Sequence, residues 1–284
     1  MKILVTGANG QLGRHLGQAL AMSSCDYVLL TRSDLDIRCQ QSVFEMVTSH
    51  SPDIIINAAA YTDVNGAETQ PELAYDVNAK GAGFLAAAAE SINAAIIHFS
   101  TDYVFSGEKQ GSYSEEDSAA PLNIYGLSKY AGELEVITAN PKHIILRTSW
   151  VFSEHGMNFY RTMRRLGQER SEISVVADQF GGPTYSQDLA EAALTIASHL
   201  QNTALSSWGT YHYCGQPYVS WFELAQEIFG HCHHIASKLI PISTADYSAV
   251  TKRPLNSRLN CTKIYKAFGI VPSDWKNALK ELNR

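Results

Sequence analysis

Short, continuously apolar segments alternate with helix-like segments along the first half of the chain. Helical periodicity marks the alanine-rich residues 79–90 and residues 126–137. The strand-like segments are Lys2–Thr6, Tyr27–Leu30, Ile54–Asn57, Ala95–Ser100 and Ile144–Thr148. Buried strands that alternate with helices are typical of βαβ units, in which helices cover both faces of a parallel sheet. The pattern predicts an α/β fold with a doubly wound parallel sheet (Rossmann), with its ligand beyond the carboxyl ends of the strands.

The regular alternation weakens after residue 150. We expect a helix at Phe159–Gln168, a strand at 173–179, a loop at 180–185 and helices from Gln187 and over 220–230. This change favours a dinucleotide-binding domain at residues 1–150 and a smaller α/β substrate-binding domain, mainly at residues 151–284. We expect the chain to return to the first domain around residues 187–216.

The first predicted strand ends in a glycine-rich turn, "TGANGQLG", which contains Gly7, Gly10 and Gly13. Glycine permits a tight turn and a close approach of the backbone to a pyrophosphate, and the start of a helix offers unpaired N–H groups. A glycine triplet alone is a weak signal. Here it follows a strand and precedes a helical pattern, which is the context that the motif requires. The turn predicts a dinucleotide site.

The residues after the second strand bear on which nicotinamide cofactor binds. Asp26 has about the expected spacing for a ribose-binding acid, but it precedes this strand, whereas Thr31 and Arg32 follow it. A guanidinium suits a 2′-phosphate better than a ribose diol, so NADPH is favoured and NADH remains an alternative. Asp36 and Ile37 could flank the adenine.

The third strand ends in small residues that suit a close approach to a cofactor. We expect the segment to pass alongside the cofactor, although tight helix packing would also explain it. Its residues are Ala58, Ala59, Ala60, Tyr61 and Thr62.

Tyr125 and Lys129 lie one turn apart on a predicted helix, a pairing that also occurs by chance. Thr101 and Asp102 end the preceding strand. Hydride transfer to a carbonyl carbon leaves negative charge on the oxygen, which a phenol can protonate. Lys129 could lower the pKa of Tyr125 and also bind the nicotinamide ribose, while Thr101 holds the substrate oxygen. The arrangement predicts carbonyl reduction.

Charge and cysteine content exclude some other functions. The net charge of -6 disfavours nucleic-acid binding. The five cysteines follow no disulfide or metal spacing, which favours a reducing compartment. The sequence starts directly in a strand, without the pattern of a secretory signal, and contains no apolar run of about 20 residues. We therefore expect a cytoplasmic protein without membrane or nucleic-acid partners.

Motifs along nearly the whole chain resemble the dTDP-4-dehydrorhamnose reductases, which are extended short-chain dehydrogenase/reductases. The matching motifs are "TGANGQLG", "NAAAYTDV", "STDYVFSG", "PLNIYGLSKYAGE", "LRTSWVF", "NFYRTM", "VVADQFGGPTY" and "RP" followed by "SRL". The first and fourth belong to the whole superfamily, whereas "STDYVF", "RTSW" and "DQFGGPT" are narrower. The resemblance implies NADPH-dependent reduction of the 4-keto group of a dTDP-6-deoxy sugar, which gives dTDP-L-rhamnose for cell-surface polysaccharide.

The resemblance also implies roles for individual residues. Thr101, Tyr125 and Lys129 are similar to the family's catalytic trio. Asp102 and Trp150 resemble its sugar contacts. The implied cofactor contacts are Asn9, Gly10, Gln11, Leu12, Ala60, Tyr61 and Thr62, and the weaker candidates for the nucleotide diphosphate are Asn158, Phe159, Arg253 and Arg258.

One departure concerns metal binding. Some members of the family hold an interface metal through a glutamate in the first helix, where this chain has His15. We therefore predict no metal site, and a homodimer is left open. The run His231–His234 is interpreted as a helix end, since consecutive residues cannot all converge on one tetrahedral ion.

Two other functions stay open. A dehydratase or epimerase would use the same fold, but Tyr103 stands where those enzymes have a glutamate. A regulatory subunit would bind the nucleotide without turnover.

Overall fold

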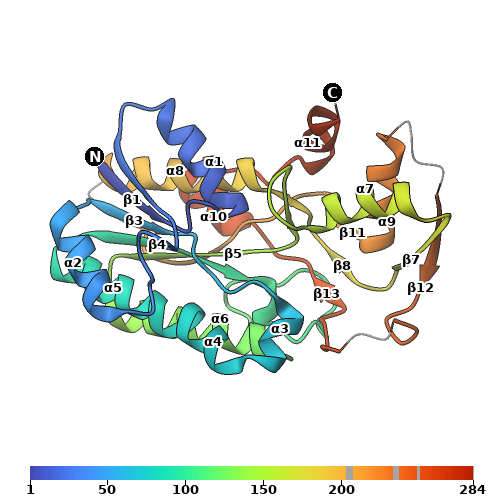
Figure 1. Ribbon diagram of the computed structural model, residues 1–284, viewed down its shortest axis with the longest axis horizontal. Helices are drawn as coiled ribbons and strands as arrows, with labels where there is room; N and C mark the ends of the chain where they lie inside the picture. Colours follow the sequence, from blue (N-terminus) through green and yellow to red (C-terminus); the bar gives the residue numbers. More distant parts are fainter. Residues whose placement is uncertain (203–206, 233–236, 248–249, 284) are drawn as a thin grey trace.

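A parallel sheet of six strands lies at the centre of the computed structural model, which describes residues 1–202, 207–232, 237–247 and 250–283 (Figure 1). The strand order is β10-β5-β4-β3-β1-β2. The strands are β1 (Lys2–Thr6), β2 (Asp26–Leu30), β3 (Ile54–Asn57), β4 (Ala95–Thr101), β5 (His143–Thr148) and β10 (Gly209–His212). The predicted doubly wound sheet is confirmed.

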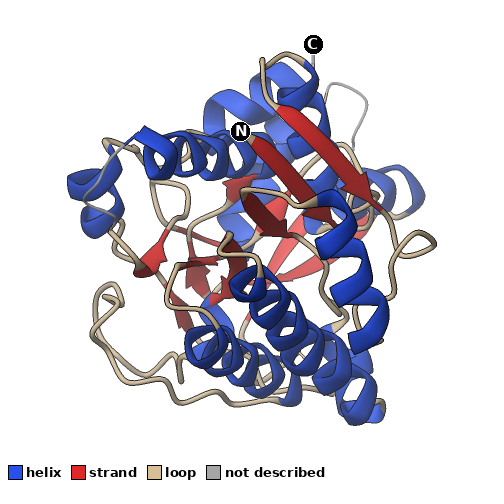
Figure 2. Ribbon diagram, turned by 90° about the vertical axis from the view of Figure 1, so that its left-hand side faces the viewer, coloured by secondary structure: helices blue, strands red, loops and turns tan. Residues whose placement is uncertain are grey.

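Helices cover both faces of this sheet, and Figure 2 shows the strands between them. One face carries α1 (Gln11–Ala21), α8 (Ser186–Asn202) and α10 (Thr262–Phe268). The other carries α2 (Gln40–His50), α5 (Ala82–Ser91) and α6 (Ile124–Ala139). Shorter turns of helix lead into α5 and away from β4: α3 (Val64–Thr69), α4 (Pro71–Tyr75), the π-helix η1 (Asp76–Gly81) and the 3-10 helix η2 (Asp102–Val104).

The strands are apolar throughout because successive side chains enter two different cores. Ile3 and Val5 pack with Leu16 of α1, whereas Leu4 between them packs with Val43 of α2 and its neighbours. All are fully buried. This two-sided burial accounts for the continuous apolar runs in the sequence.

The second half of the chain builds a region of short sheets beside the carboxyl ends of the main strands (Figure 1). Its pairs are β6 (Val151–Phe152) with β9 (Thr184–Tyr185), β7 (Glu172–Val176) with β12 (Lys238–Ile242), and β8 (Phe180–Gly181) with β11 (Val219–Ser220) and β13 (Asn256–Ser257). The helices are α7 (Phe159–Glu169), α9 (Trp221–Gly230) and α11 (Trp275–Leu282). The predicted loop at 180–185 thus contains two short strands, because distant segments supply their partners.

Besides α10, two elements from the second half of the chain lie on the main sheet or form part of it. The long helix α8 packs along α1, and β10 pairs with β5 in parallel register. Helix α9 ends at Gly230, and residues 233 and 234 of the histidine run lie outside the described residues. None of the described helices has the length and apolar character needed to cross a membrane.

Candidate active site

The turn between β1 and α1 is built for a close approach of the backbone. Gly7 has φ +71°, and a Cβ there would lie 2.6 Å from the amide nitrogen of Ala59. A Cβ on Gly13 would lie 2.2 Å from the carbonyl oxygen of Gly7. No side chain caps the start of α1 at Gly10, so the first-turn N–H groups are available to a phosphate. The turn therefore fits the pyrophosphate of a dinucleotide.

A side chain that the sequence did not single out holds the segment after β3. Asn78 accepts a hydrogen bond from the Tyr61 amide (2.8 Å) and donates to the Tyr61 carbonyl oxygen (3.0 Å). Its amide also donates to the hydroxyl of Ser128 on α6 (3.0 Å). This clamp fixes the path of Ala58–Thr62 against α6. The only signal in the sequence is an asparagine within an alanine-rich helical segment.

Beyond β2, the expected adenine-binding residues are partly engaged with one another. Asp36 accepts a hydrogen bond from Arg38 (2.9 Å), which lowers the pKa of Asp36 to about 2. Ile37 is buried and packs near Gly81. Arg32 is exposed at the end of the strand, where a guanidinium can meet a 2′-phosphate.

Thr101 and Tyr125 converge at the end of β4. Asn123 caps the start of α6 by accepting a hydrogen bond from the Gly126 amide (2.8 Å), which places Tyr125 in the first turn. The Tyr125 hydroxyl lies near Thr101, and the Tyr125 ring forms an edge contact with the Tyr103 ring, with 5.6 Å between the centroids. The pair therefore offers a proton donor and a hydroxyl at one point.

Lys129 lies one turn beyond Tyr125 and is almost fully buried, with 2 % exposure. Its Nζ donates to the carbonyl oxygen of Phe99 (2.6 Å). Burial lowers the pKa of Lys129 to about 8, against the opposing charge of Glu133. The backbone of β4 thus holds the Lys129 ammonium, and its pKa is lower than that of an exposed lysine.

The predicted effect of Lys129 on the pKa of Tyr125 stays a prediction. Burial raises the pKa of Tyr125 to about 12, a hydrogen bond from Thr101 opposes this shift, and the charge of Asp102 adds to it. Lys129 Nζ donates to the Phe99 carbonyl oxygen. The phenol is therefore protonated near neutral pH, which is the state that a proton donor requires.

Two buried polar atoms near this point have no partner among the described residues. The Thr101 hydroxyl donates to Asp102 Oδ1 (3.0 Å), but Asp102 Oδ2 is unpaired. Burial raises the pKa of Asp102 to about 6. Arg253 Nε, which comes from the second half of the chain, is also buried and unpaired. Unpaired buried groups are costly, so a bound ligand is a natural partner for them.

Trp150 is held in a strained position beyond β5. Its backbone has φ +50°, and its ring stacks on Trp221 with centroids 3.6 Å apart and planes 9° apart. Phe159 packs against Trp221 at 4.6 Å. Strain of this kind persists only where the surroundings over-determine it, and it clusters at ligand sites. Trp150 as a residue is half-buried, and its indole lies between the Trp221 ring and the neighbourhood of Gly181.

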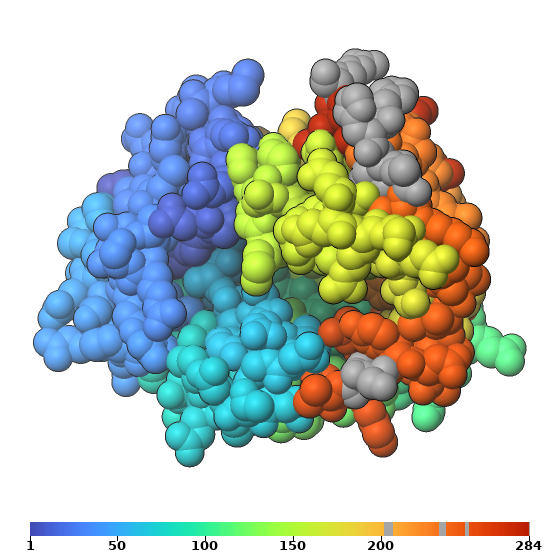
Figure 3. Space-filling view, turned by 45° about the vertical axis from the view of Figure 1, so that its right-hand side comes forward, coloured from blue at the N-terminus to red at the C-terminus, as the bar shows by residue number. Residues whose placement is uncertain are grey.

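The space-filling view shows a hollow between the cyan, yellow-green and orange parts of the chain (Figure 3). These colours include the segment after β3, the segment after β5 and the chain near residue 253. The hollow therefore lies between the sheet region and the region of short strands.

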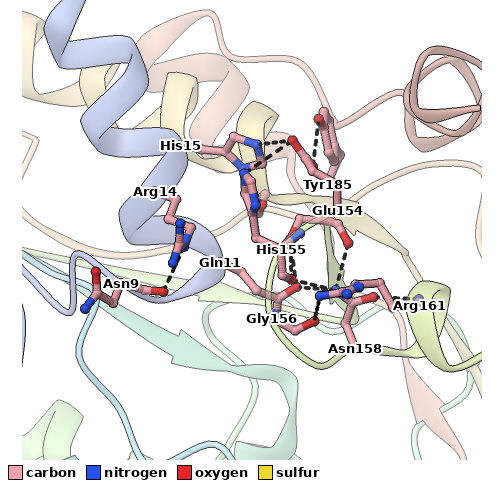
Figure 4. A network of polar contacts seen from close by, with 12 residues as sticks. Asn9, Gln11, Arg14, His15, Glu154, His155, Gly156, Asn158, Arg161 and Tyr185 are labelled. Carbon is pink, nitrogen blue, oxygen red and sulfur yellow. Dashed lines mark hydrogen bonds and ion pairs between the residues drawn. The ribbon is translucent and has the colours of Figure 1, made fainter. Parts of the chain in front are cut away.

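The Asn158 side chain is hydrogen-bonded within the protein, at the loop before α1, and does not face an open substrate position. It caps α7 by accepting from the Arg161 amide (3.0 Å), and its own amide donates to Gln11 Oε1 (2.8 Å) (Figure 4). Arg258 donates to Asn256 (2.8 Å) and lies over Phe180. Among the weaker candidates for the nucleotide diphosphate, Arg253 thus has a side-chain nitrogen, Nε, with no hydrogen-bond partner among the described residues.

His15 belongs to a cluster above the same loop (Figure 4). Its Nδ1 lies 2.6 Å from Ser186 Oγ, and its Nε2 lies 3.2 Å from Glu154 Oε1. Burial lowers the pKa of His15. His15, Glu154 and His155 each offer one ligand atom, and these three atoms lie within 4.8 Å of one another, close enough to share a metal ion. The absence of a metal stays a prediction.

Comparisons with known proteins match this chain over its whole length. The family model described as "RmlD substrate binding domain" matches residues 1–284. The dTDP-4-dehydrorhamnose reductase of Aggregatibacter actinomycetemcomitans is 48% identical over 289 residues, which cover 99% of this chain and 98% of that protein. A crystal structure of a dTDP-4-dehydrorhamnose reductase from Clostridium acetobutylicum ATCC 824 is similar, with a TM-score of 0.94, 39% identity, and coverage of 99% of this chain and 98% of that one. Another, from Bacillus anthracis str. Ames in complex with NADP, has a TM-score of 0.91, 40% identity and the same coverage.

Proposed function

The chain belongs to the RmlD substrate binding domain family, and on this basis we propose that it reduces the 4-keto group of dTDP-4-dehydro-L-rhamnose to give dTDP-L-rhamnose. The observation that carries the proposal is that Tyr125 and Thr101 lie together at the end of β4, with Lys129 one turn away on α6. NADPH is the cofactor, as the NADP bound to the Bacillus anthracis relative supports.

The residues around the glycine turn fit this cofactor. A Cβ at Gly7 or Gly13 would clash with the chain's own backbone, so glycine permits the tight turn there, and the start of α1 offers free N–H groups. When bound, the nicotinamide supplies the hydride. We assign the phosphate-side contacts to the turn and the ribose-side contacts to Tyr125 and Lys129. The remaining contacts come from the segment after β3, which the Asn78 clamp holds in place.

The proton and the orientation of the sugar come from the chain itself. Tyr125 donates its phenolic proton to the substrate oxygen, and Thr101 donates a hydrogen bond to the same oxygen. Asp102 and Arg253 each present an unpaired buried atom, which suits a sugar hydroxyl and a phosphate. Trp150 lies against the sugar ring.

We also propose that residues 1–150, together with α8, β10 and α10, form the NADPH-binding domain, and that residues 151–284 otherwise form mainly the substrate-binding domain. The pairing of β10 with β5 and the packing of α8 on α1 support this division. A homodimer and a cytoplasmic location stay predictions from the sequence.

We expect Arg32→Ala to narrow the preference for NADPH over NADH. The guanidinium pairs with a 2′-phosphate that NADH lacks, so its removal weakens NADPH and leaves NADH nearly unchanged. Fluorescence titration of the two cofactors gives both dissociation constants. Arg165→Ala is the control, because this exposed arginine pairs with Glu169 on α7, and its ratio of constants should match the wild type. An unchanged ratio in Arg32→Ala would remove Arg32 from the site.

We expect Trp150→Ala to raise the KM for the dTDP-sugar about tenfold or more and to leave NADPH affinity nearly unchanged. The indole ring presents a large apolar face to the sugar, worth on the order of 1–3 kcal/mol. Steady-state kinetics and a cofactor titration separate the two effects. Equal losses of both would mean that Trp150 is only a packing residue between the two regions.

A panel of substrates distinguishes this function from the alternatives. Purified protein with NADPH is mixed with dTDP- and UDP-4-keto sugars, and the absorbance of the reduced cofactor is followed. A reductase oxidises NADPH with the dTDP sugar, whereas a regulatory subunit binds NADPH without consuming it. Net release of water or epimerisation without NADPH consumption would contradict the proposal.

A further inference from the structure

A row of three polar side chains crosses the sheet behind Lys129. Thr6, Asn57 and His98 are register partners on the neighbouring strands β1, β3 and β4. Each is about 1 % exposed. They follow Leu4, Ile55 and Ile96, which fill the core under α2 and α5. Polar groups thus replace the apolar layer where the strands approach the candidate active site.

The orientation of the Asn57 amide is fixed by a backbone donor. Asn57 Oδ1 accepts hydrogen bonds from the Thr6 hydroxyl (2.7 Å) and from the Ala59 amide (3.2 Å). A backbone N–H can only donate, so the atom facing Ala59 must be the oxygen. The NH₂ group of Asn57 therefore points in the other direction, to His98 Nδ1 at 3.0 Å.

This contact fixes the tautomer of His98. An NH₂ group only donates, so His98 Nδ1 must accept and carries no proton. The imidazole is fully buried, and burial together with the charge of Lys129 lowers the pKa of His98. The neutral ring therefore has its proton on Nε2, and that nitrogen lies 3.5 Å from Lys129 Nζ.

An Nε2–H group facing Lys129 discriminates between the two states of the lysine. The ammonium only donates, so it gains nothing from a second donor at this position. The neutral amine has a lone pair that can accept the Nε2 proton in a long hydrogen bond. We propose that Asn57 and His98 are positioning residues that favour the neutral amine of Lys129 by presenting it with a hydrogen-bond donor. This inference rests on the proposed role of Lys129 in the reduction.

Some of the other groups around Lys129 favour its ammonium form and some favour its neutral amine. On α6 itself, Glu133 favours the ammonium, although Arg147 of β5 pairs with Glu133 and reduces its effect. From β4, the Phe99 carbonyl also favours the ammonium, whereas His98 opposes it. Beyond the end of β4 lies Asp102, whose carboxyl bonds to Thr101. Burial favours the neutral amine, Glu133 and the Phe99 carbonyl oppose it, and the donor from His98 acts in the same direction as burial.

The tautomer is tested directly in the unmodified full-length protein. Histidine labelled with ¹⁵N in the ring is incorporated, and long-range ¹H–¹⁵N spectra report which nitrogen is protonated. His98→Gln assigns the signal. The expected result is a neutral ring with the proton on Nε2 across the pH range of folding. A ring protonated on Nδ1, or an imidazolium near pH 7, would overturn the proposal without any variant of Asn57.

The effect on Lys129 is tested by titration. Lysine labelled with ¹³C at Cε gives the pKa of Lys129, assigned with Lys129→Met. In Asn57→Asp the carboxylate accepts from Nδ1–H, so Nε2 becomes an acceptor for the ammonium and the pKa of Lys129 should rise by about one unit or more. Asn57→Leu removes the donor without adding charge, frees the tautomer and should raise the pKa by a smaller amount.

Thr6→Val is the matched control in the same row. It removes one donor to Asn57 Oδ1, but the Ala59 amide still fixes the orientation of Asn57, so the tautomer of His98 and the pKa of Lys129 should stay as in the wild type. If Asn57→Asp and Asn57→Leu fold and leave the pKa of Lys129 unchanged, Asn57 and His98 do not favour the neutral amine and the proposal is wrong. Full turnover by Lys129→Met would instead contradict the proposed catalytic role and leave the titration result intact.

Discussion

Tyr125→Phe is expected to lower kcat about 10²–10⁴-fold while folding and NADPH binding are retained. The change keeps the ring and its edge contact with Tyr103 and removes only the hydroxyl that would protonate the substrate oxygen. At 1.36 kcal/mol per decade this is about 3–5 kcal/mol of transition-state stabilisation. Because the pKa of Tyr125 is about 12, the wild-type phenol is protonated at neutral pH and is available as the acid. Single-turnover kinetics with the 4-keto sugar measure the effect on the chemical step.

Two further variants separate the roles at this point. Lys129→Met should also slow turnover and should in addition weaken NADPH, because Lys129 has a second role at the ribose. The double variant should lose less than the product of the two single effects, since residues that act as a unit are not additive. Near wild-type turnover by Tyr125→Phe, with chemistry rate-limiting, would mean that Tyr125 and Lys129 are ordinary neighbours on a helix.

Arg147→Met is expected to lower the free energy of unfolding by about 3–5 kcal/mol. Arg147 donates two hydrogen bonds to Glu133, at 2.8 and 2.6 Å, and the two side chains are 7 % and 1 % exposed. Glu133 also accepts from Ser100 at the end of β4 (2.5 Å). Without the guanidinium, the buried Glu133 carboxylate keeps the hydrogen bond from Ser100 but loses its ion-pair partner. Urea unfolding followed by circular dichroism measures the change.

The double variant Glu133→Leu/Arg147→Met is the control for this experiment. It removes both charges and replaces them with apolar side chains, so it should be more stable than Arg147→Met alone. Equal stability of the two variants would show that the loss comes from packing of the Arg147 side chain on Phe105, at 5.1 Å, and not from the carboxylate left without its ion-pair partner.

The sequence predicted the sheet region more fully than the region after residue 150. Each predicted strand of the first half lies within or next to an observed one, because two-sided burial imposes continuous apolar runs that are readable locally. The strands β8 and β9 have two residues each and pair with segments far along the chain. A pairing of that length leaves no periodic pattern in the sequence.

The candidate site shows the same division between what is local and what is assembled. The glycine turn and the spacing of Tyr125 and Lys129 can be read from the chain, since each lies within one turn or one helix. The polar residues that support the glycine turn and the Tyr125–Lys129 pair could not be predicted from the sequence. Asn57 and His98 are single polar residues in apolar segments, Asn78 precedes an alanine-rich segment, and their partners other than the Ala59 amide lie 17–51 residues away.

The sequence by itself determined the doubly wound fold, the dinucleotide turn and the phenol–ammonium pair, because spacing along one strand or helix fixes which face a side chain occupies. Only the tertiary structure decided the state of those groups. The pKa of Tyr125 is raised because burial outweighs the opposing effect of Thr101, and Lys129 Nζ reaches the Phe99 carbonyl oxygen because α6 packs on β4. Desolvation and hydrogen-bond direction depend on atoms from several strands at once, so they exist only after the sheet has formed.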